Sequence, residues 1–401
     1  MARSVASLPN GTRLSDFITL GVIARFIPLP VVFDVLRKNG KESKRIRDLP
    51  AHLVVYYVIA LALFMQVSYR EVLRCIVDGI RWLRIGGPVK IPGKSGISQA
   101  RSRLGADVLE QLHDHVVHPV ATKATKGAWY RSWRIVSLDG STMDAADEES
   151  NTASFGRHTH SRGHSPFPQV RYVSLVENGT HVLFGTRIGG AARIDEIALA
   201  RQVFGATQLG KDVLILADRY FYGFELWNHA RAGGADLLWR VKKNLRLPCE
   251  KRLPDESYLS RVYPSQEDQR RGKNGIVVRV VEYVLEGLPD ADPLYRLLTT
   301  IVDHEAAPAN ELAALYHERW EIETALDELK THLRGGRIVL RSKKPDLVKQ
   351  EFYGFLLAHF AIRSLMHEAA LIAKEDTDRL SFIHAVRVVR RQVVRATTIS
   401  P

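Results

Sequence analysis

The sequence predicts an α/β protein in which a core of strands and helices lies between two helical ends. Residues 14–117 carry mostly helical patterns of apolar residues. Residues 134–241 carry short apolar runs that alternate with amphipathic segments, and residues 346–395 return to helical spacing. With 401 residues, the chain is long enough for two or three domains with sizeable cores.

Charge and cysteine content narrow the class of protein. The 57 basic and 44 acidic residues give a net charge of +13, which suits a polyanionic partner, and nucleic acid is the leading candidate. Binding to ribosomes or to a membrane surface would also explain the charge. Cys75 and Cys249 lack CxxC spacing, so we expect a reducing compartment rather than a disulfide scaffold. The longest apolar run, Leu53–Met65, is too short to cross a bilayer and no signal peptide is visible. We therefore expect a cytoplasmic protein and a buried helix at 53–65.

A short basic helix is predicted late in the N-terminal region. It follows a Pro/Gly-rich break at Gly86–Gly93 and begins near a serine cap within Ser95–Gly105. It would present Gln99, Arg101 and Arg103, and such side chains can read adenine and guanine in a DNA groove. An ordinary solvated helix explains the same pattern equally well.

Two apolar strands in the middle of the chain are each followed by an aspartate. Arg134–Asp139 is a short strand ending in one, with Gly140 supplying the turn. Asp212–Asp218 is a continuous apolar run, typical of a fully buried strand. Between them, residues 170–188 alternate like a hairpin with its turn at Asn178-Gly179. The order, three strands followed by strands alternating with helices, resembles an RNase H-like fold, with the first Asp on strand one and the second on strand four.

Residues Leu312–Leu333 are predicted to form one amphipathic helix. Apolar residues at i, i+4, i+7 and i+11 should face the core: Ile322, Leu326, Leu329 and Leu333. Beside this stripe, four polar side chains fall within an arc of roughly 60°, in a row about 21 Å long. They are Tyr316, Arg319, Glu323 and Lys330. A salt-bridged solvent face is the alternative interpretation of this row.

The spacing of this row, Tyr-x2-Arg-x3-Glu-x6-Lys, resembles the signature of the insertion-sequence-four family of bacterial DDE transposases. Leu138–Thr142 and Leu216–Phe221 are similar to the family's first and second aspartate motifs, and Val54–Leu73 resembles its N-terminal domain. Phe167–Arg171 and Leu237–Lys242 are further similarities. The resemblance extends over most of the chain, from about residue 20 to 370.

The resemblance implies a metal-dependent enzyme acting on DNA. Its catalytic residues and metal ligands would be Asp139, Asp218 and Glu323, which together would hold two Mg²⁺ ions, with Mn²⁺ as a substitute. The DNA phosphates would be held by Tyr316, Arg319, Lys330 and Arg219. Asp327 lies along the same helix face as Glu323 and is a rival metal ligand.

The family also implies cut-and-paste transposition through hairpin ends. Its DNA partners would be the terminal inverted repeats of the element and the target DNA, both double-stranded. A second copy of the chain would join it in the synaptic complex. The protein would act at the nucleoid and would not bind a membrane. Relatives stack a flipped base on an aromatic residue of the β insertion. The candidates here are Tyr258, Tyr263, Tyr283 and Tyr295. A catalytically silent DNA-binding relic and an RNase H-like nuclease are the alternatives.

The predicted division of the chain follows from these assignments. We expect a helical N-terminal DNA-binding domain at 1–125 and the first part of an RNase H-like core at 126–241. An all-β insertion would occupy residues 242–305. The catalytic helix and the C-terminal helices would together occupy residues 306–401. A histidine-rich loop within the core, with His158, His160 and His164, is expected to be solvated near DNA rather than to bind a metal.

Overall fold

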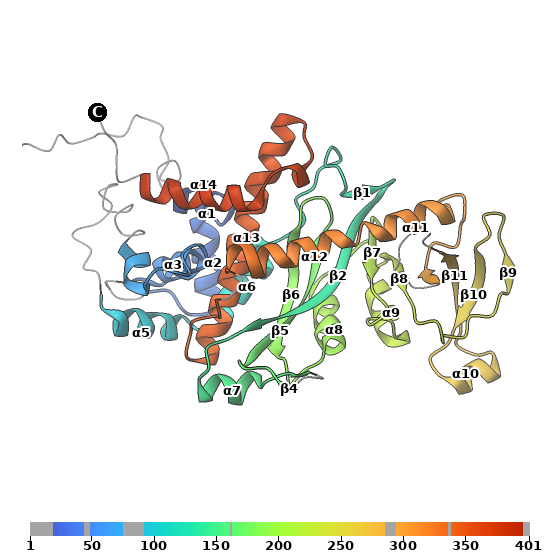
Figure 1. Ribbon diagram of the computed structural model, residues 1–401, viewed down its shortest axis with the longest axis horizontal. Coiled ribbons are helices and arrows are strands. Elements are labelled where there is room, and N and C mark those ends of the chain that lie inside the picture. The colour runs from blue at the N-terminus through green and yellow to red at the C-terminus, as the bar shows by residue number, and fades with distance from the viewer. Residues whose placement is uncertain are drawn as a thin grey trace, which may run out of the picture. The chain divides into compact units, whose positions relative to one another are not determined.

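The computed structural model describes residues 19–43, 49–74, 92–160, 163–284, 294–335 and 338–395. The chain divides into two compact units (Figure 1). The helical unit comprises Met1–Val117, Leu329–Ala369 and Leu380–Pro401, and the sheet unit comprises His118–Glu328 and Ala370–Arg379.

The helical unit is built around two apolar helices. Its described elements are α1 (Thr19–Phe26), α2 (Leu29–Lys38), α3 (Ala51–Leu63), α5 (Lys94–Leu104), α6 (Asp107–Val116), the π-helix η2 that begins at the unit boundary (Glu328–Leu333), most of α13 (Pro345–Ala373), and α14 (Phe382–Arg395). Every residue from Leu53 to Leu63 is buried, which confirms the predicted buried helix. Gly354 lets α13 approach α3 closely, because a Cβ there would lie 2.8 Å from the Val58 carbonyl oxygen.

Helix α13 is long and apolar enough to cross a membrane, but 72% of its most apolar window is buried inside the protein. That burial is typical of a core helix. A further helix begins at Tyr69 and is described as far as Arg74, and residues 75–91 lie outside the described residues.

The predicted basic helix forms as α5, but its three polar side chains differ in exposure. Gln99 and Arg103 are exposed. Arg101 is only 3% exposed, and its guanidinium donates to the Leu347 carbonyl at 2.8 Å and to Ser342 Oγ at 3.1 Å. The prediction that Arg101 reads a base is therefore wrong, because base contact requires a guanidinium at the surface. Arg101 instead ties α5 to the start of α13.

A ten-stranded sheet forms the core of the sheet unit. Its order is β6-β5-β2-β7-β8-β12-β11-β10-β9, with β1 beside β2. The strands are β1 (Trp129–Tyr130), β2 (Trp133–Asp144), β5 (Gln169–Glu177), β6 (Val182–Gly190), β7 (Val213–Ala217), β8 (Asp236–Arg240), β9 (Lys251–Arg252), β10 (Tyr258–Val262), β11 (Ile276–Tyr283) and β12 (Tyr295–Thr299). The remaining elements are β3 (Thr159–His160), β4 (Gly163–His164), α7 (Glu149–Phe155), α8 (Glu196–Ala206), α9 (Phe224–Arg231), α10 (Gln266–Arg271), α11 (Ala309–His317), α12 (Trp320–Asp327) and the 3₁₀-helix η3 (Thr377–Arg379).

The strand connections match the order predicted for an RNase H-like core. β2, β5 and β6 pair antiparallel, and β7 then pairs parallel with both β2 and β8. The strands of residues 242–305 continue the same sheet, because β12 pairs antiparallel with β8. That segment also contains the short helix α10, which the all-β prediction did not include.

Candidate active site

Strand register brings the first two predicted carboxylates together. The parallel pairing of β2 with β7 ends at Leu138 opposite Ala217, so the next residue on each strand is an aspartate, Asp139 and Asp218. β2 does not end at Asp139 as predicted. It continues to Asp144, because its other edge stays paired with β5. Asp139 therefore lies at the point where β2 loses one of its two neighbours.

The predicted catalytic helix is three helical segments rather than one. α11 ends at His317, α12 begins at Trp320, and the π-helix η2 follows α12. The predicted apolar stripe is nevertheless buried on all four of its residues. Lys330 lies in η2 and belongs to the helical unit, so its place beside the carboxylates stays a prediction.

Arg319, between α11 and α12, links the predicted carboxylates. One of its guanidinium nitrogens lies 3.5 Å from Asp139 Oδ2, and the other lies 3.3 Å from Glu323 Oε1. Burial opposes the charge of Arg319, but Tyr316, the two aspartates and Glu323 together raise its pKa. All three predicted carboxylates therefore lie within electrostatic reach of one guanidinium.

Tyr316 is buried at the end of α11 and contacts the strand that carries the second aspartate. Its hydroxyl lies 3.4 Å from the carbonyl oxygen of Ala217, the residue before Asp218. Burial raises the pKa of Tyr316 to about 12. The hydroxyl therefore remains a neutral donor at physiological pH and holds α11 against the end of β7.

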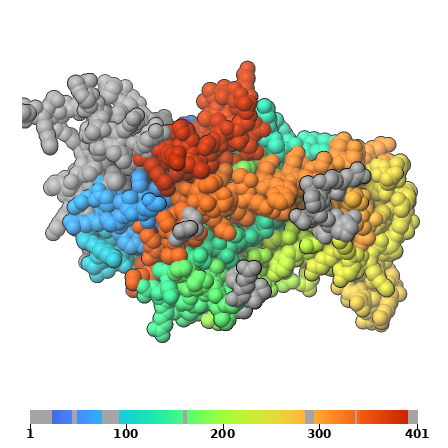
Figure 2. Space-filling view, viewed as in Figure 1, coloured from blue at the N-terminus to red at the C-terminus, as the bar shows by residue number. Residues whose placement is uncertain are grey.

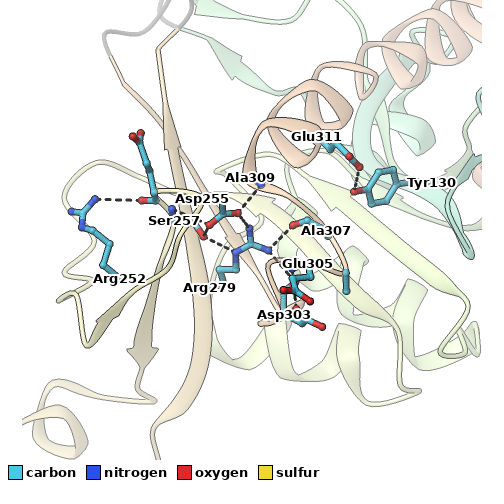
Figure 3. A network of polar contacts seen from close by, with 12 residues as sticks. Tyr130, Arg252, Asp255, Ser257, Arg279, Asp303, Glu305, Ala307, Ala309 and Glu311 are labelled. Carbon is cyan, nitrogen blue, oxygen red and sulfur yellow. Dashed lines mark hydrogen bonds and ion pairs between the residues drawn. The ribbon is translucent and has the colours of Figure 1, made fainter.

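A buried arginine fixes the N-terminal end of α11 (Figure 3). Arg279 of β11 is fully buried; it donates to the Ala307 carbonyl at 2.6 Å and forms an ion pair with Asp255. Asp255 in turn accepts from the backbone N–H of Ala309, the first residue of α11, at 2.9 Å. The residues of the β insertion thus position the helix that carries Tyr316.

The environment of Asp139 favours its protonated form. Burial raises its pKa to about 6, and the charges of Asp218 and Glu196 add to the effect. A hydrogen bond from the Gly140 N–H, at 2.7 Å, and the Arg319 charge oppose it. A site of this kind, with several carboxylates and one buried member, gains free energy by binding a cation.

A fourth carboxylate, which the residue pattern did not indicate, is Glu196 at the start of α8. A Cβ on Gly140 would lie 3.1 Å from Glu196 Cδ, so the Glu196 side chain crosses directly over the residue after Asp139. Glu196 Oε1 is 3.9 Å from Arg171 Nε, and burial together with the Asp218 charge raises the pKa of Glu196. Only the packing of α8 on β5 and β6 brings Glu196 to the site, so the residue pattern alone does not indicate it.

The outer side of the site is open. The side chain of Glu323 is 46% exposed. Trp320 and Tyr220 are 63% and 50% exposed, and the Tyr220 N–H donates to Asp218 Oδ1 at 2.8 Å. In the space-filling view, the orange atoms of the α11–α12 region form an exposed band on the face drawn (Figure 2). The exposure of these aromatic residues was not predicted, because the residue pattern does not indicate which aromatic side chains remain at the surface.

The other predicted site residues have separate surroundings. Arg219 is exposed next to Asp218, and Asp327 is exposed at the end of α12. Tyr283 and Tyr295 stack with ring centroids 5.2 Å apart, whereas Tyr258 is buried. Tyr263 lines a polar pocket with Arg246 and Arg261.

The histidine-rich loop contributes the short strands β3 and β4. The side chain of His160 lies outside the described residues, and in the described part of the chain no metal-type cluster includes His158 or His164.

The donors at the site suit a hard divalent cation. Asp139, Asp218 and Glu323 offer carboxylate oxygens alone, the ligand type that Mg²⁺ and Mn²⁺ take in proteins. The positive Arg319 lies among these oxygens in the structure, which shows that the arrangement stabilises positive charge. The residues present therefore fit a divalent metal.

Two family models match the chain. That of the insertion element 4 transposase N-terminal domain matches residues 17–114, and that of the transposase DDE domain matches residues 132–361, which include Asp139, Asp218 and Glu323. The transposase InsG for insertion sequence element IS4 of Escherichia coli (strain K12) is 27% identical over 396 residues, covering 97% of this chain and 84% of that relative. The DDE model covers more than half of the chain, so the chain belongs to the DDE transposases of the insertion element 4 type and is a DNA transposase of an insertion sequence.

Proposed function

We propose that Asp139, Asp218 and Glu323 are the catalytic carboxylates, and that they hold two Mg²⁺ ions during cut-and-paste transposition. A DDE domain implies dependence on a divalent metal. The observation that carries the assignment is the contact of Arg319 with both Asp139 and Glu323, at a strand end where Asp139 and Asp218 are in register. When bound, the metal ions would activate the attacking oxygen and stabilise the leaving oxygen.

The protein's own groups would bind and orient the DNA. Arg319, at the centre of the carboxylates, can hold the scissile phosphate bidentately once the metal neutralises its present partners. Arg219 is exposed beside Asp218 and can hold a neighbouring phosphate. Tyr316 keeps α11 against β7 and so places Arg319. We include Lys330 as a further phosphate contact on the strength of its motif position.

These roles support cleavage of the DNA in successive steps at the end of the element. The oxygen of a water molecule attacks phosphorus, the bond to the 3′ oxygen breaks, and a free 3′-hydroxyl results. That hydroxyl then attacks a phosphorus of the opposite strand. The new phosphodiester bond closes the hairpin, and the bond to the 3′ oxygen of the flanking strand breaks, which releases the flanking DNA with a 3′-hydroxyl of its own. Hydrolysis of the hairpin restores the 3′-hydroxyl that joins to target DNA. Two ends must be held at once, so we propose a dimer in the synaptic complex, with the exposed Gln99 and Arg103 of α5 contacting the terminal repeats.

The experiment is a cleavage assay on DNA that carries the inverted repeats flanking the gene. Wild-type protein with Mg²⁺ should cut at the repeat ends and produce hairpins, whereas unrelated DNA should stay intact. Asp139→Ala should bind the same DNA and leave it uncut. Equal cutting by Asp139→Ala would refute the assignment, cutting of unrelated DNA at a similar rate would indicate a nuclease, and binding without any metal-dependent cutting would indicate a silent relic.

A further inference from the structure

A second group of acidic side chains surrounds a buried histidine in the sheet unit. His181 lies in the turn between β5 and β6, is 3% exposed, and has neither ring nitrogen hydrogen-bonded within the protein. Glu321 lies in α12, Glu328 directly follows the last residue of α12, and Asp378 lies in η3. Leaving a buried imidazole without a hydrogen bond costs free energy, so its surroundings need an explanation.

The distances around His181 are close to those between the ligand atoms of a metal site. His181 Nε2 lies 3.3 Å from Asp378 Oδ1 and 3.9 Å from Glu321 Oε2. One ligand atom from each of the three residues lies within 4.8 Å of the other two. In a tetrahedral zinc site with bonds of about 2.0–2.2 Å, neighbouring ligand atoms are roughly 3.3–3.6 Å apart.

Glu328 supports the tautomer that such a site requires. Its Oε1 lies 3.5 Å from His181 Nδ1, and its side chain is almost fully buried. A carboxylate beside Nδ1 favours a proton on that nitrogen, which leaves the Nε2 lone pair facing Glu321 and Asp378. Metal-binding histidines commonly have this carboxylate partner on the second nitrogen.

The charge of the group also calls for a cation. Glu321 Oε2, Glu328 Oε1 and Asp378 Oδ1 each lie within 3.9 Å of a ring nitrogen of His181. Three carboxylates around one imidazole leave excess negative charge in a mostly buried place. A divalent ion would neutralise two of these charges, whereas a protonated histidine would neutralise only one.

We propose that His181 Nε2, Glu321 and Asp378 bind a divalent transition metal of the zinc class, with Glu328 orienting the histidine ring. The imidazole nitrogen favours such a metal over Mg²⁺, which takes oxygen ligands. The site is separate from the carboxylates at Asp139, because Glu321 and Glu323 are two residues apart on α12 and so point about 200° apart.

The consequence of the site is a fixed position for α12. The ion would join the β5–β6 turn, α12 and η3, three segments distant in sequence. The same turn already contacts this region: Asn178 Nδ2 donates to the Glu318 carbonyl at 3.2 Å, and the Gly179 N–H donates to Glu321 Oε2. Metal binding would add to these contacts and so hold Arg319 and Glu323 in place.

The test measures bound metal in full-length protein whose catalytic carboxylates are removed by Asp139→Asn, Asp218→Asn and Glu323→Gln. After chelation and dialysis against Zn²⁺, elemental analysis should find one tightly held Zn²⁺ per chain. The midpoint of thermal unfolding of this protein should rise by roughly 5–10 °C when free Zn²⁺ is at a hundredfold excess over its Kd. Millimolar Mg²⁺ should neither displace the ion nor reproduce the rise.

Variants of the ligands decide the location. In this background, Asp378→Asn and His181→Ala should lose the bound Zn²⁺ and the thermal shift, and should lose the visible absorption of bound Co²⁺. Glu375→Gln is the matched control, since Glu375 is exposed in the same segment and pairs with Arg379 instead. Asp378 is 40% exposed, so its variant is expected to fold.

Absence of tight Zn²⁺ binding, or unchanged Zn²⁺ content in Asp378→Asn, would overturn the proposal. Either outcome would leave the transposase assignment untouched, because the catalytic carboxylates are absent from the measurement.

Discussion

Two groups of carboxylates flank α12, and they differ in exposure and in donor type. Around Glu323 the neighbouring acidic groups offer only carboxylate oxygens, Arg319 lies among them, and the Glu323 side chain is 46% exposed. Around Glu321 there is an imidazole, and the Glu321 side chain is only 18% exposed. A site that must admit DNA and release product has to be open, whereas a site that only holds segments together can be closed. One short helix can therefore serve both purposes on its two sides.

Removing a carboxylate on the open side should have the largest effect. We expect Asp139→Asn, Asp218→Asn and Glu323→Gln each to lower end cleavage by about 10³-fold or more, because one metal ligand is lost each time. Gel-based cleavage of DNA with the inverted repeats measures this. Asp327→Asn is the matched control on the same helix. If Asp327→Asn abolishes cleavage while Glu323→Gln stays active, Asp327 is the third ligand.

Arg319 should come next in size. Arg319→Ala is expected to lower cleavage by about 10²-fold, because it removes the guanidinium that contacts both Asp139 and Glu323. Arg319→Lys should restore only part of the rate, since an ammonium cannot hold two oxygens in one plane. Single-turnover rates at saturating DNA measure both variants. Full activity in the lysine variant would show that charge alone suffices.

The pH dependence should report the burial of Asp139. Its pKa is raised to about 6, so cleavage should fall as pH drops below about 6 and the ligand becomes protonated. The sign for stability is the reverse: a raised carboxyl pKa means that stability is lost as pH rises through 6. Without metal, Asp139→Asn should therefore be more stable than wild type by about 1–3 kcal/mol at pH 8.

Urea unfolding of both proteins at pH 8 and at pH 4.5 measures that difference. The advantage of Asp139→Asn should shrink toward the lower pH. An advantage that is equal at the two pH values would mean that the aspartate is not held in an environment that favours its neutral form.

Glu196 should have the smallest effect of this series. Its charge raises the pKa of Asp139, so Glu196→Gln should move the acidic limb of the pH–rate profile to lower pH. The rate at pH 7.5 should change by less than about tenfold, because no metal ligand is lost in the proposed site. A loss as large as that of Glu323→Gln would make Glu196 a ligand. Glu225→Gln, an exposed carboxylate on α9 that pairs with Arg201, is the matched control.

Local patterns predicted the elements that carry the open site. The continuous apolar run before Asp218 is β7, all five of whose residues are buried. The hairpin with its turn at Asn178-Gly179 is also as predicted. Each of these features depends on neighbouring residues, so it is visible in the sequence.

Features that depend on distant partners were not predicted. The extension of β2 to Asp144 comes from its pairing with β5, and the burial of Arg101 comes from acceptors such as Leu347, 246 residues away. The break between α11 and α12 at Glu318–Arg319 contains no Gly or Pro, the residues from which a helix break is usually predicted. The group around His181 draws on three segments whose approach only the tertiary structure reveals.

The most direct test of the account compares two single variants of α12, Glu323→Gln and Glu321→Gln, for end cleavage in Mg²⁺ and for bound Zn²⁺. We predict that Glu323→Gln abolishes cleavage and keeps the zinc, whereas Glu321→Gln loses the zinc and still cleaves at a measurable rate. Wild-type cleavage by Glu323→Gln would contradict the central claim that this side of the helix performs the chemistry.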